Sequence, residues 1–250
     1  MTGQHVKATL VTMLELNGIS KRYGIRNVLV DLDASLQPGT VTAIVGPNGS
    51  GKSTLLRLLW GELRPDSGSI TWKGETVDTS AETWKRLVGA VPDDDALVEG
   101  LSIEGHFRLC GAFSSLLPRE LAERTAHLIR LFSLEEAMRT TRSADEASRG
   151  NRKRLALALA LLGEPGIVLM DEPFSGLDAE RAATLATILR LLAQRGRVVV
   201  FSCHDDGITR SAADHYLLVR GGKASGGRIE QLPPQTTQAL DSAGALPWLA

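Results

Sequence analysis

Three short segments of the chain are rich in β-branched and apolar residues without polar alternation: VTAIV at 41–45, GIVLM at 166–170 and VVVFS at 198–202. A strand with one solvated face alternates apolar and polar residues, whereas a parallel strand covered on both faces does not. These segments therefore predict buried parallel strands, and the helical stretches between them predict an α/β core.

Two other regions have different patterns. The segments 14–23, 28–36 and 68–75 are alternating or β-rich, and turn signals such as QPGT and PDSG separate them, which predicts an antiparallel β lobe. Between 102 and 147 there is no strand-like run. Pro118 suits the first position of a helix over RELAERTAHLIRLF, and SLEE at 133–136 matches a capping box, so we predict a mostly helical insertion.

Composition narrows the class of protein. The chain has 250 residues, 43% hydrophobic and 23% charged, with a formal net charge of -1, so nothing attracts it globally to nucleic acid and we expect no such partner. Cys110 and Cys203 lie outside any metal-binding spacing and predict reduced thiols. The longest apolar run, 155–162, is too short to span a bilayer, and we expect no membrane crossing. The segment 221–250 is rich in Gly, Pro, Gln and Ser and predicts an irregular extension.

A glycine-rich segment, GPNGSGKST at 46–54, follows one buried strand and precedes the helical LLRLLW. Glycines allow the backbone to turn its N–H groups toward phosphate oxygens, and the next helix presents its positive end to the same anion. Lysine adds charge toward the β- and γ-phosphates, and the following serine hydroxyl is suited to Mg²⁺. A flexible glycine-rich turn is the alternative. The predicted cofactor-binding residues are Gly46, Pro47, Asn48, Gly49, Ser50, Gly51, Lys52, Ser53 and Thr54.

Adjacent carboxylates, Asp171 and Glu172, come directly after the second buried strand, at the end where open parallel sheets bind ligands. We predict that Asp171 holds Mg²⁺ through water and that Glu172 is the general base for an attacking water. His204 follows the third strand and is suited to contact the γ-phosphate or the same water. A solvated acidic turn and an ordinary surface or core histidine are the alternatives.

The segment DEASRGNRKRL at 145–155 places a basic run at the start of an apolar helix. Cations there oppose the helix macrodipole at a cost of about 0.3–1 kcal/mol each. One interpretation is that this helix end is directed at an anion. The alternative is a purely structural helix cap made by Ser148.

Taken together, GPNGSGKST, LMDEPFSGLD and FSCHD resemble the ATP-binding cassette of ABC transporters over residues 14–228. The resemblance implies a P-loop NTPase core with a mainly parallel sheet, an antiparallel β lobe and a helical subdomain at about 95–163, with extensions at 1–13 and 229–250. It implies ATP and Mg²⁺ as cofactors, Lys52, Glu172 and His204 as catalytic residues, and 175–178, ending at Asp178, as the D-loop. Tyr23 stands where the family stacks an aromatic ring on adenine, with packing in the β lobe as its alternative.

Two motifs depart from the family pattern. ASRGN at 147–151 stands where Leu-Ser-Gly-Gly-Gln is usual, and Ser148 and Gly150 match the positions that contact the γ-phosphate of ATP on a second cassette. Asp93 replaces the usual glutamine; aspartate still suits Mg²⁺, so the expected metal ligands are Ser53, Asp93 and Asp171. An independent metal cluster at Asp93–Asp95 is the lesser interpretation.

The resemblance implies an ATPase subunit that dimerises, as a homodimer or heterodimer, and powers a separate membrane-spanning subunit. We expect it in the cytoplasm, on the inner face of the cell membrane, with the helical insertion contacting the membrane subunit. The motif sequences are most similar to those of ABC-2-type exporters. The alternatives are a non-transport ABC ATPase and a weakly hydrolysing cassette that acts as a nucleotide-controlled interaction module.

Overall fold

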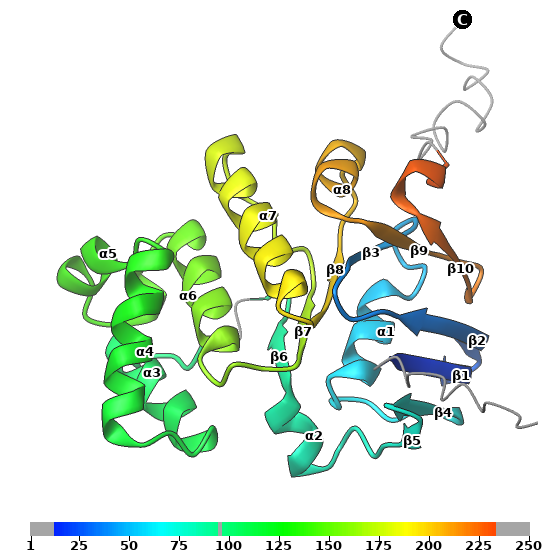
Figure 1. The fold of residues 1–250 in the computed structure, drawn as a ribbon, viewed down its shortest axis with the longest axis horizontal. Coiled ribbons are helices and arrows are strands. Elements are labelled where there is room, and N and C mark those ends of the chain that lie inside the picture. Colours follow the sequence, from blue (N-terminus) through cyan, green and yellow to red (C-terminus); the bar gives the residue numbers. More distant parts are fainter. Residues whose placement is uncertain (1–12, 95–96, 234–250) are drawn as a thin grey trace, which may run out of the picture.

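The computed structural model of the chain describes residues 13–94 and 97–233. Its centre is a six-stranded sheet in the order β10-β9-β3-β8-β7-β6, in which every neighbouring pair is parallel except β9 with β10 (Figure 1). The strands are β3 (Val41–Val45), β6 (Val88–Val91), β7 (Ile167–Met170), β8 (Val198–Ser202), β9 (His215–Arg220) and β10 (Lys223–Arg228).

The strands β3, β7 and β8 are buried on both faces, and their successive residues contribute to different hydrophobic clusters. In β7, Ile167 and Leu169 face one cluster while Val168 and Met170 face the other. Side chains alternate between the two faces of a strand, so a strand that is covered on both sides needs apolar residues throughout. The three predicted parallel strands are therefore confirmed.

One face of the sheet packs on α1 (Lys52–Leu59), whose other side packs on a four-stranded antiparallel sheet in the order β2-β1-β4-β5. This second sheet is the predicted β lobe and contains β1 (Leu14–Tyr23), β2 (Arg26–Leu36), β4 (Ser67–Trp72) and β5 (Glu75–Thr76). The hairpin of β1 and β2 brings Tyr23 and Arg26 beside the loop that precedes α1.

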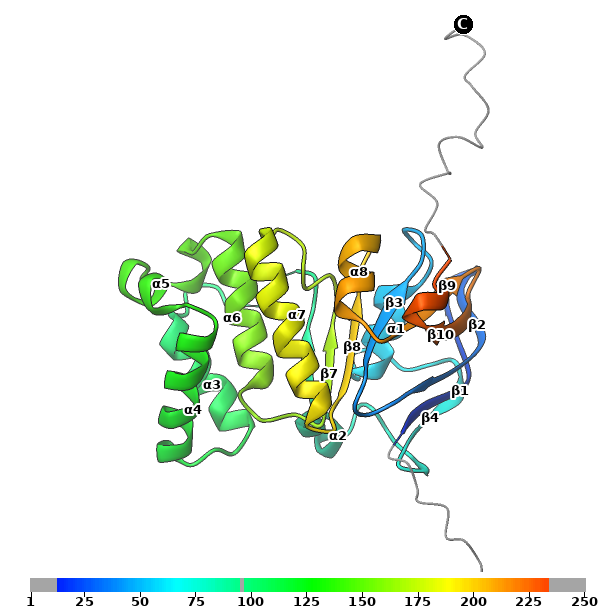
Figure 2. The same cartoon turned by 45° about the horizontal axis from the view of Figure 1, so that its top comes forward.

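Helices cover the other face of the parallel sheet, and α6, α7 and α8 stand side by side along it (Figure 2). The predicted helical insertion is confirmed, and its helices lie on the side of α6 that faces away from α7 (Figure 1). The helices are α2 (Glu82–Leu87), α3 (Ile103–Phe113), α4 (Pro118–Leu131), α5 (Glu135–Thr140), α6 (Arg149–Leu161), α7 (Ala179–Gln194) and α8 (Asp206–Ala212), with short 3₁₀ turns at Ala144–Glu146 and Ile229–Gln231. In the described part of the chain, no helix has the length and apolar character of a membrane span.

Two local predictions are wrong. Pro118 opens α4 as expected, but SLEE makes no capping box: Ser133 has a positive φ of 50°, Leu134 is the N-cap of α5, and no side chain caps it. The segment after Gly221 is not irregular at its start, because residues 223–228 form β10 and pair with β9. Ile229 and Leu232 are also buried in the core. Residues 1–12, 95–96 and 234–250, including most of both predicted extensions and Asp95, lie outside the described residues.

Candidate functional site

A cleft of about 500 Å³ opens at the carboxyl ends of β3 and β7, beside the β1–β2 hairpin. It brings together residues that the sequence places more than a hundred positions apart. Its lining is made by Tyr23, Arg26, Val28, Asn48, Gly49, Gly51, Lys52, Ser53, Thr54, Asp93, Asp171 and Glu172.

The loop between β3 and α1 has a backbone that only glycine adopts easily. Gly46, Gly49 and Gly51 have φ values of 145°, 73° and 111°. A Cβ atom on Gly46 would lie 2.2 Å from the carbonyl oxygen of Val219, so this position also has no room for a side chain. Such a loop leads its N–H groups into a concave anion site at the start of α1.

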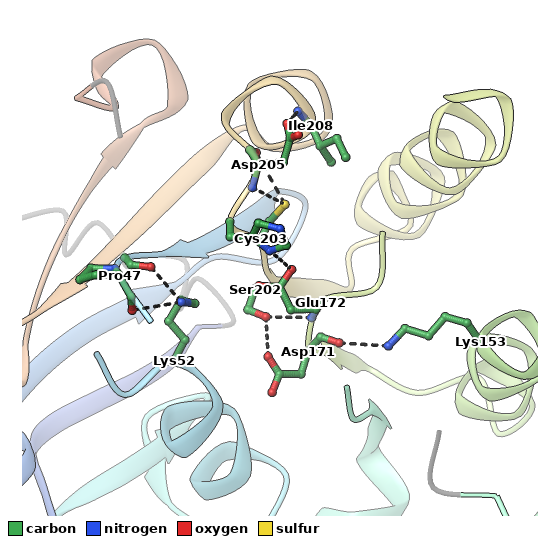
Figure 3. A network of polar contacts seen from close by, with 11 residues as sticks. Pro47, Lys52, Lys153, Asp171, Glu172, Ser202, Cys203, Asp205 and Ile208 are labelled. Atoms are coloured by element: carbon green, nitrogen blue, oxygen red, sulfur yellow. Dashed lines mark hydrogen bonds and ion pairs between the residues drawn. The ribbon is translucent and has the colours of Figure 1, made fainter. Parts of the chain in front are cut away.

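Lys52 begins α1 and turns back over this loop (Figure 3). Its buried Nζ donates to the carbonyl oxygen of Gly46 at 2.8 Å and to that of Pro47 at 3.3 Å. The Ser50 hydroxyl oxygen is buried and makes no hydrogen bond within the described residues. A buried ammonium and an unpartnered hydroxyl beside an N–H-lined loop fit a polyphosphate, which would supply acceptors to these donors.

Asp171 and Glu172 follow β7, and Ser202 at the end of β8 lies between them (Figure 3). The fully buried Ser202 hydroxyl donates to Oδ1 of Asp171 at 2.5 Å and accepts from the Glu172 N–H at 2.8 Å. Glu172 has a positive φ of 48°, which is unusual for a residue with a long side chain. Ser202 was not among the residues predicted from the sequence, although its position at the end of a buried strand indicates that it lies at the ligand-binding edge of the sheet.

His204 does not line the cleft itself but contacts it through Glu172. Its Nδ1 lies 2.9 Å from Oε2 of Glu172, and its side chain is largely exposed. The preceding Cys203 is buried, and this burial raises the pKa of its thiol. Cys203 therefore stays a neutral thiol at pH 7.

The cleft fits Mg²⁺ only together with a phosphate ligand. Within residues 13–94 and 97–233, no three His, Cys, Asp or Glu side chains converge on a metal site. The alternative of an independent cluster at Asp93–Asp95 includes Asp95, which lies outside the described residues. Asp93, Asp171 and Ser53 line the same cleft, and magnesium is usually bound by one or two carboxylates together with waters and substrate phosphates.

Ser148, Gly150 and Asp178 lie outside the lining of this cleft in the described part of the chain. Ser148 is the N-cap of α6, and its hydroxyl accepts from the Asn151 N–H at 3.3 Å. Asp178 is the N-cap of α7 and pairs with Arg181. Ser148 and Asp178 thus each cap a helix. Both are exposed at the helix start, where a second molecule has access to them.

Two cations of the basic run, Lys153 and Arg154, point into the fold, while the anion predicted for the helix start at Ser148 stays a prediction. Arg154 turns inward and donates to the carbonyl oxygens of Phe132 and Ser133 at 2.8 and 2.9 Å. Burial lowers the pKa of Arg154. Lys153 is buried against other carbonyl groups, so these two cations are not directed at an external anion.

Comparisons with known proteins agree on one family. A family model described as ABC transporter matches residues 29–175. The Fe(3+) ions import ATP-binding protein FbpC 2 of Pectobacterium atrosepticum is 40% identical over 85% of this chain, which spans 62% of that relative's length. The Nod factor export ATP-binding protein I of Cupriavidus metallidurans is 31% identical over 86% of this chain and 70% of its own.

Solved structures agree with this result. An ATP-binding subunit of an ABC transporter superposes with a TM-score of 0.80 at 28% identity, covering 94% of this chain and 95% of its own. A dimeric ATP-binding cassette in a post-hydrolysis state with ADP and phosphate has a TM-score of 0.75 at 21% identity, covering 88% of this chain and 100% of its own. The second likeness supports the fold alone.

Proposed function

This chain belongs to the ABC transporter family, and from that premise we propose that it binds and hydrolyses ATP to drive a separate membrane-spanning partner. One observation carries the proposal: a single cleft joins the glycine loop and Lys52 to the carboxylates of Asp171 and Glu172. The relatives whose names state ATP binding support the choice of nucleotide.

We propose a role for each side chain of the cleft. The loop N–H groups and Lys52 hold the phosphates, and Tyr23 at the rim offers a face for the adenine ring. Ser53, Asp93 and Asp171 would hold Mg²⁺, which when bound neutralises charge on the phosphate oxygens. Glu172 accepts the proton of the attacking water, and His204, 2.9 Å from that carboxylate, orients it.

The test of this proposal is the variant Glu172→Gln. Removal of a general base lowers turnover by about 10²–10⁴-fold. We expect the variant to bind ATP as tightly as the unaltered chain, to lose phosphate release by that factor, and to accumulate as an ATP-bound dimer. Calorimetric binding, a phosphate-release assay and size-exclusion chromatography measure the three quantities.

A matched control is Glu180→Gln, which removes an exposed carboxylate in the first turn of α7. Its turnover should equal that of the unaltered chain. Full turnover in Glu172→Gln would remove Glu172 from the mechanism. Absence of ATP binding by the unaltered chain would contradict the proposal as a whole.

A weakly hydrolysing interaction module is the second candidate, and Asp93 is the observation that favours it. This carboxylate lines the cleft where the family uses a neutral amide, so it adds negative charge beside the triphosphate. Steady-state hydrolysis with and without the membrane partner separates the candidates. An ATP-driven transporter subunit turns over faster with its partner, whereas an interaction module stays slow in both conditions.

We propose that the partner docks at a groove of about 440 Å³ between β6, α2, α3 and α6. Apolar residues including Phe113 and Leu159 line it together with Lys85 and Arg86, and Phe113 is 71% exposed.

The relatives include iron-import proteins as well as a Nod factor export protein, so the comparisons do not support the predicted export direction over import. The sequence motifs remain its support, and transport assays with the cognate membrane subunit would decide it.

A further inference from the structure

Lys153 lies in the second turn of α6 and is only 3% exposed. Its Nζ donates to the carbonyl oxygens of Pro92 at 3.2 Å, Asp93 at 3.4 Å and Asp171 at 3.3 Å. Figure 3 shows the side chain extended from α6 toward Asp171, on the side away from Ser202.

A buried ammonium group is costly unless hydrogen-bond acceptors surround it. The carbonyl groups around Nζ come from two strand ends, because Pro92 and Asp93 follow β6 and Asp171 follows β7. The Asp171 N–H also donates to the carbonyl oxygen of Val91 at 2.7 Å, which holds these strand ends together. Lys153 therefore links α6 to both strand ends.

Each segment that Lys153 joins carries a residue of the proposed ATP site. Asp93 and Asp171 line the cleft, and α6 begins with Ser148 and Gly150, which we assign to the nucleotide of a second chain. A rigid link between them makes the carboxylate positions depend on the position of α6.

We propose that Lys153 is a positioning residue that sets the backbones of Asp93 and Asp171, and through them the Mg²⁺ site, according to the position of α6. This inference rests on the proposed function. Lys153 is not part of the cleft lining; it acts through Asp93 and Asp171, which are. The basic run at the start of α6 thus contains a cation that contacts the backbone of two residues of the site.

The variant Lys153→Met tests the inference, because it keeps the length of the side chain and removes the charge and the donors. ATP binding is titrated at increasing Mg²⁺ and with EDTA, in the Glu172→Gln background so that no nucleotide is consumed. Loss of an outer partner of metal ligands typically costs about 10–100-fold in metal affinity. We expect the Mg²⁺ concentration for half-maximal enhancement of ATP binding to rise about tenfold, at the lower end of that range, while affinity in EDTA is unchanged.

Arg154→Met is the matched control, because Arg154 is the neighbouring cation of α6 and also binds carbonyl groups, but those of Phe132 and Ser133. It should lower the unfolding temperature without moving the Mg²⁺ dependence. A purely structural role of Lys153 would give the same result for both variants and would overturn the inference.

Lys153→Gln, which keeps an amide donor, takes the place of Lys153→Met if that variant does not fold, and the same Mg²⁺ shift is expected. Failure of both to fold would assign Lys153 to the core alone and overturn the inference. If the unaltered chain and the variants show Mg²⁺ enhancement with the same half-maximal Mg²⁺ concentration, only this inference falls. If the unaltered chain binds no ATP, the proposed function falls and this inference with it.

Discussion

At the scale of single residues, the site depends on side chains that never touch the proposed ligands. Glu172 is held at a positive φ, which costs about 1–3 kcal/mol for a residue other than glycine. The Ser202 hydroxyl fixes this conformation by accepting from the Glu172 N–H, and its own proton satisfies the neighbouring Asp171 carboxylate. Ser202 therefore holds the predicted base and the predicted metal ligand in one geometry.

We predict that Ser202→Ala lowers turnover more than it lowers ATP affinity. The variant removes the buried donor to Asp171 and the acceptor for the Glu172 N–H, and leaving such groups unpaired costs about 1–3 kcal/mol. Denaturant unfolding measures that loss, and kcat and the ATP dissociation constant are compared. Ser211→Ala, on the exposed part of α8, is the control. Equal kcat in Ser202→Ala and the unaltered chain would show that Ser202 does not position Glu172.

We predict that Tyr23→Ala weakens binding of ATP and GTP together. Tyr23 is 46% exposed at the rim of the cleft, where its ring is free to stack on a base but offers no pattern of hydrogen bonds to distinguish bases. Loss of an aromatic stacking partner costs about 1–3 kcal/mol per base. Calorimetry measures both affinities, and Tyr23→Phe, which keeps the ring, should bind both nucleotides normally. Unchanged affinity in Tyr23→Ala would show that Tyr23 packs in the β lobe and does not stack on a base.

At the scale of elements, α2 connects the helix of the phosphate loop to β6, the strand that ends just before Asp93. Trp84 in α2 is 4% exposed, donates from Nε1 to the carbonyl oxygen of Leu59 at the end of α1 at 2.7 Å, and packs edge-to-face on Trp72 of β4. The next residues form β6, so this contact sets where β6 enters the sheet beside β7. A helix of six residues is held here by packing, since its own hydrogen bonds are too few to stabilise it.

We predict that Trp84→Phe destabilises the chain by about 2 kcal/mol, because the Leu59 carbonyl group loses its donor and the smaller ring leaves a gap. Urea unfolding measures the change. Trp60→Phe is the matched control, since the Trp60 ring donates to Glu62 at an exposed site and its loss should cost little. Equal destabilisation by the two substitutions would show that the Trp84 hydrogen bond is not what holds α2.

At the scale of the whole molecule, we propose that one chain holds only part of the nucleotide site. The parallel sheet directs Lys52, Asp171 and Glu172 into the cleft, whereas α6 and α7 present Ser148 and Asp178 away from it. A second copy or a related cassette would have to bring its own α6 start to this cleft. Family membership supports that arrangement, whereas the cap that Ser148 makes on α6 fits the structural alternative.

We predict that two inactive chains complement each other. Lys52→Ala and Ser148→Arg are each expected to be inactive as homodimers, and a heterodimer purified through two tags contains one site with an intact phosphate loop and an intact α6 start. Partial phosphate release should return, and ATP binding at one site is measured as well, in case the two sites hydrolyse only together.

Two outcomes separate the arrangements. If Ser148 served the nucleotide of its own chain, both sites of the heterodimer would stay damaged, and the mixture would neither hydrolyse ATP nor bind it at an intact site. A mixture of Lys52→Ala with itself under both tags is the control for contaminating ATPase. Recovery only in the heterodimer supports the shared site.

Sequence by itself determined the features that depend on neighbouring residues. The apolar runs predicted β3, β7 and β8 because a strand buried on both faces leaves no polar position, and the spacing of glycines, Lys52 and Ser53 predicted the loop before α1. The adjacency of Asp171 and Glu172 to a strand end likewise located them at the edge where the cleft opens.

Only the tertiary structure decided features that depend on partners distant along the chain. Ser202 meets Asp171 because β7 and β8 pair, and Lys153 meets Asp171 because α6 packs beside β6; neither contact leaves a trace in local periodicity. The Gly-rich β10 is a strand because its backbone pairs with β9 whatever its side chains are. Within the basic run of α6, Lys153 and Arg154 turn to carbonyl groups of distant segments, since hydrogen bonding inside the fold outweighs the small macrodipole term.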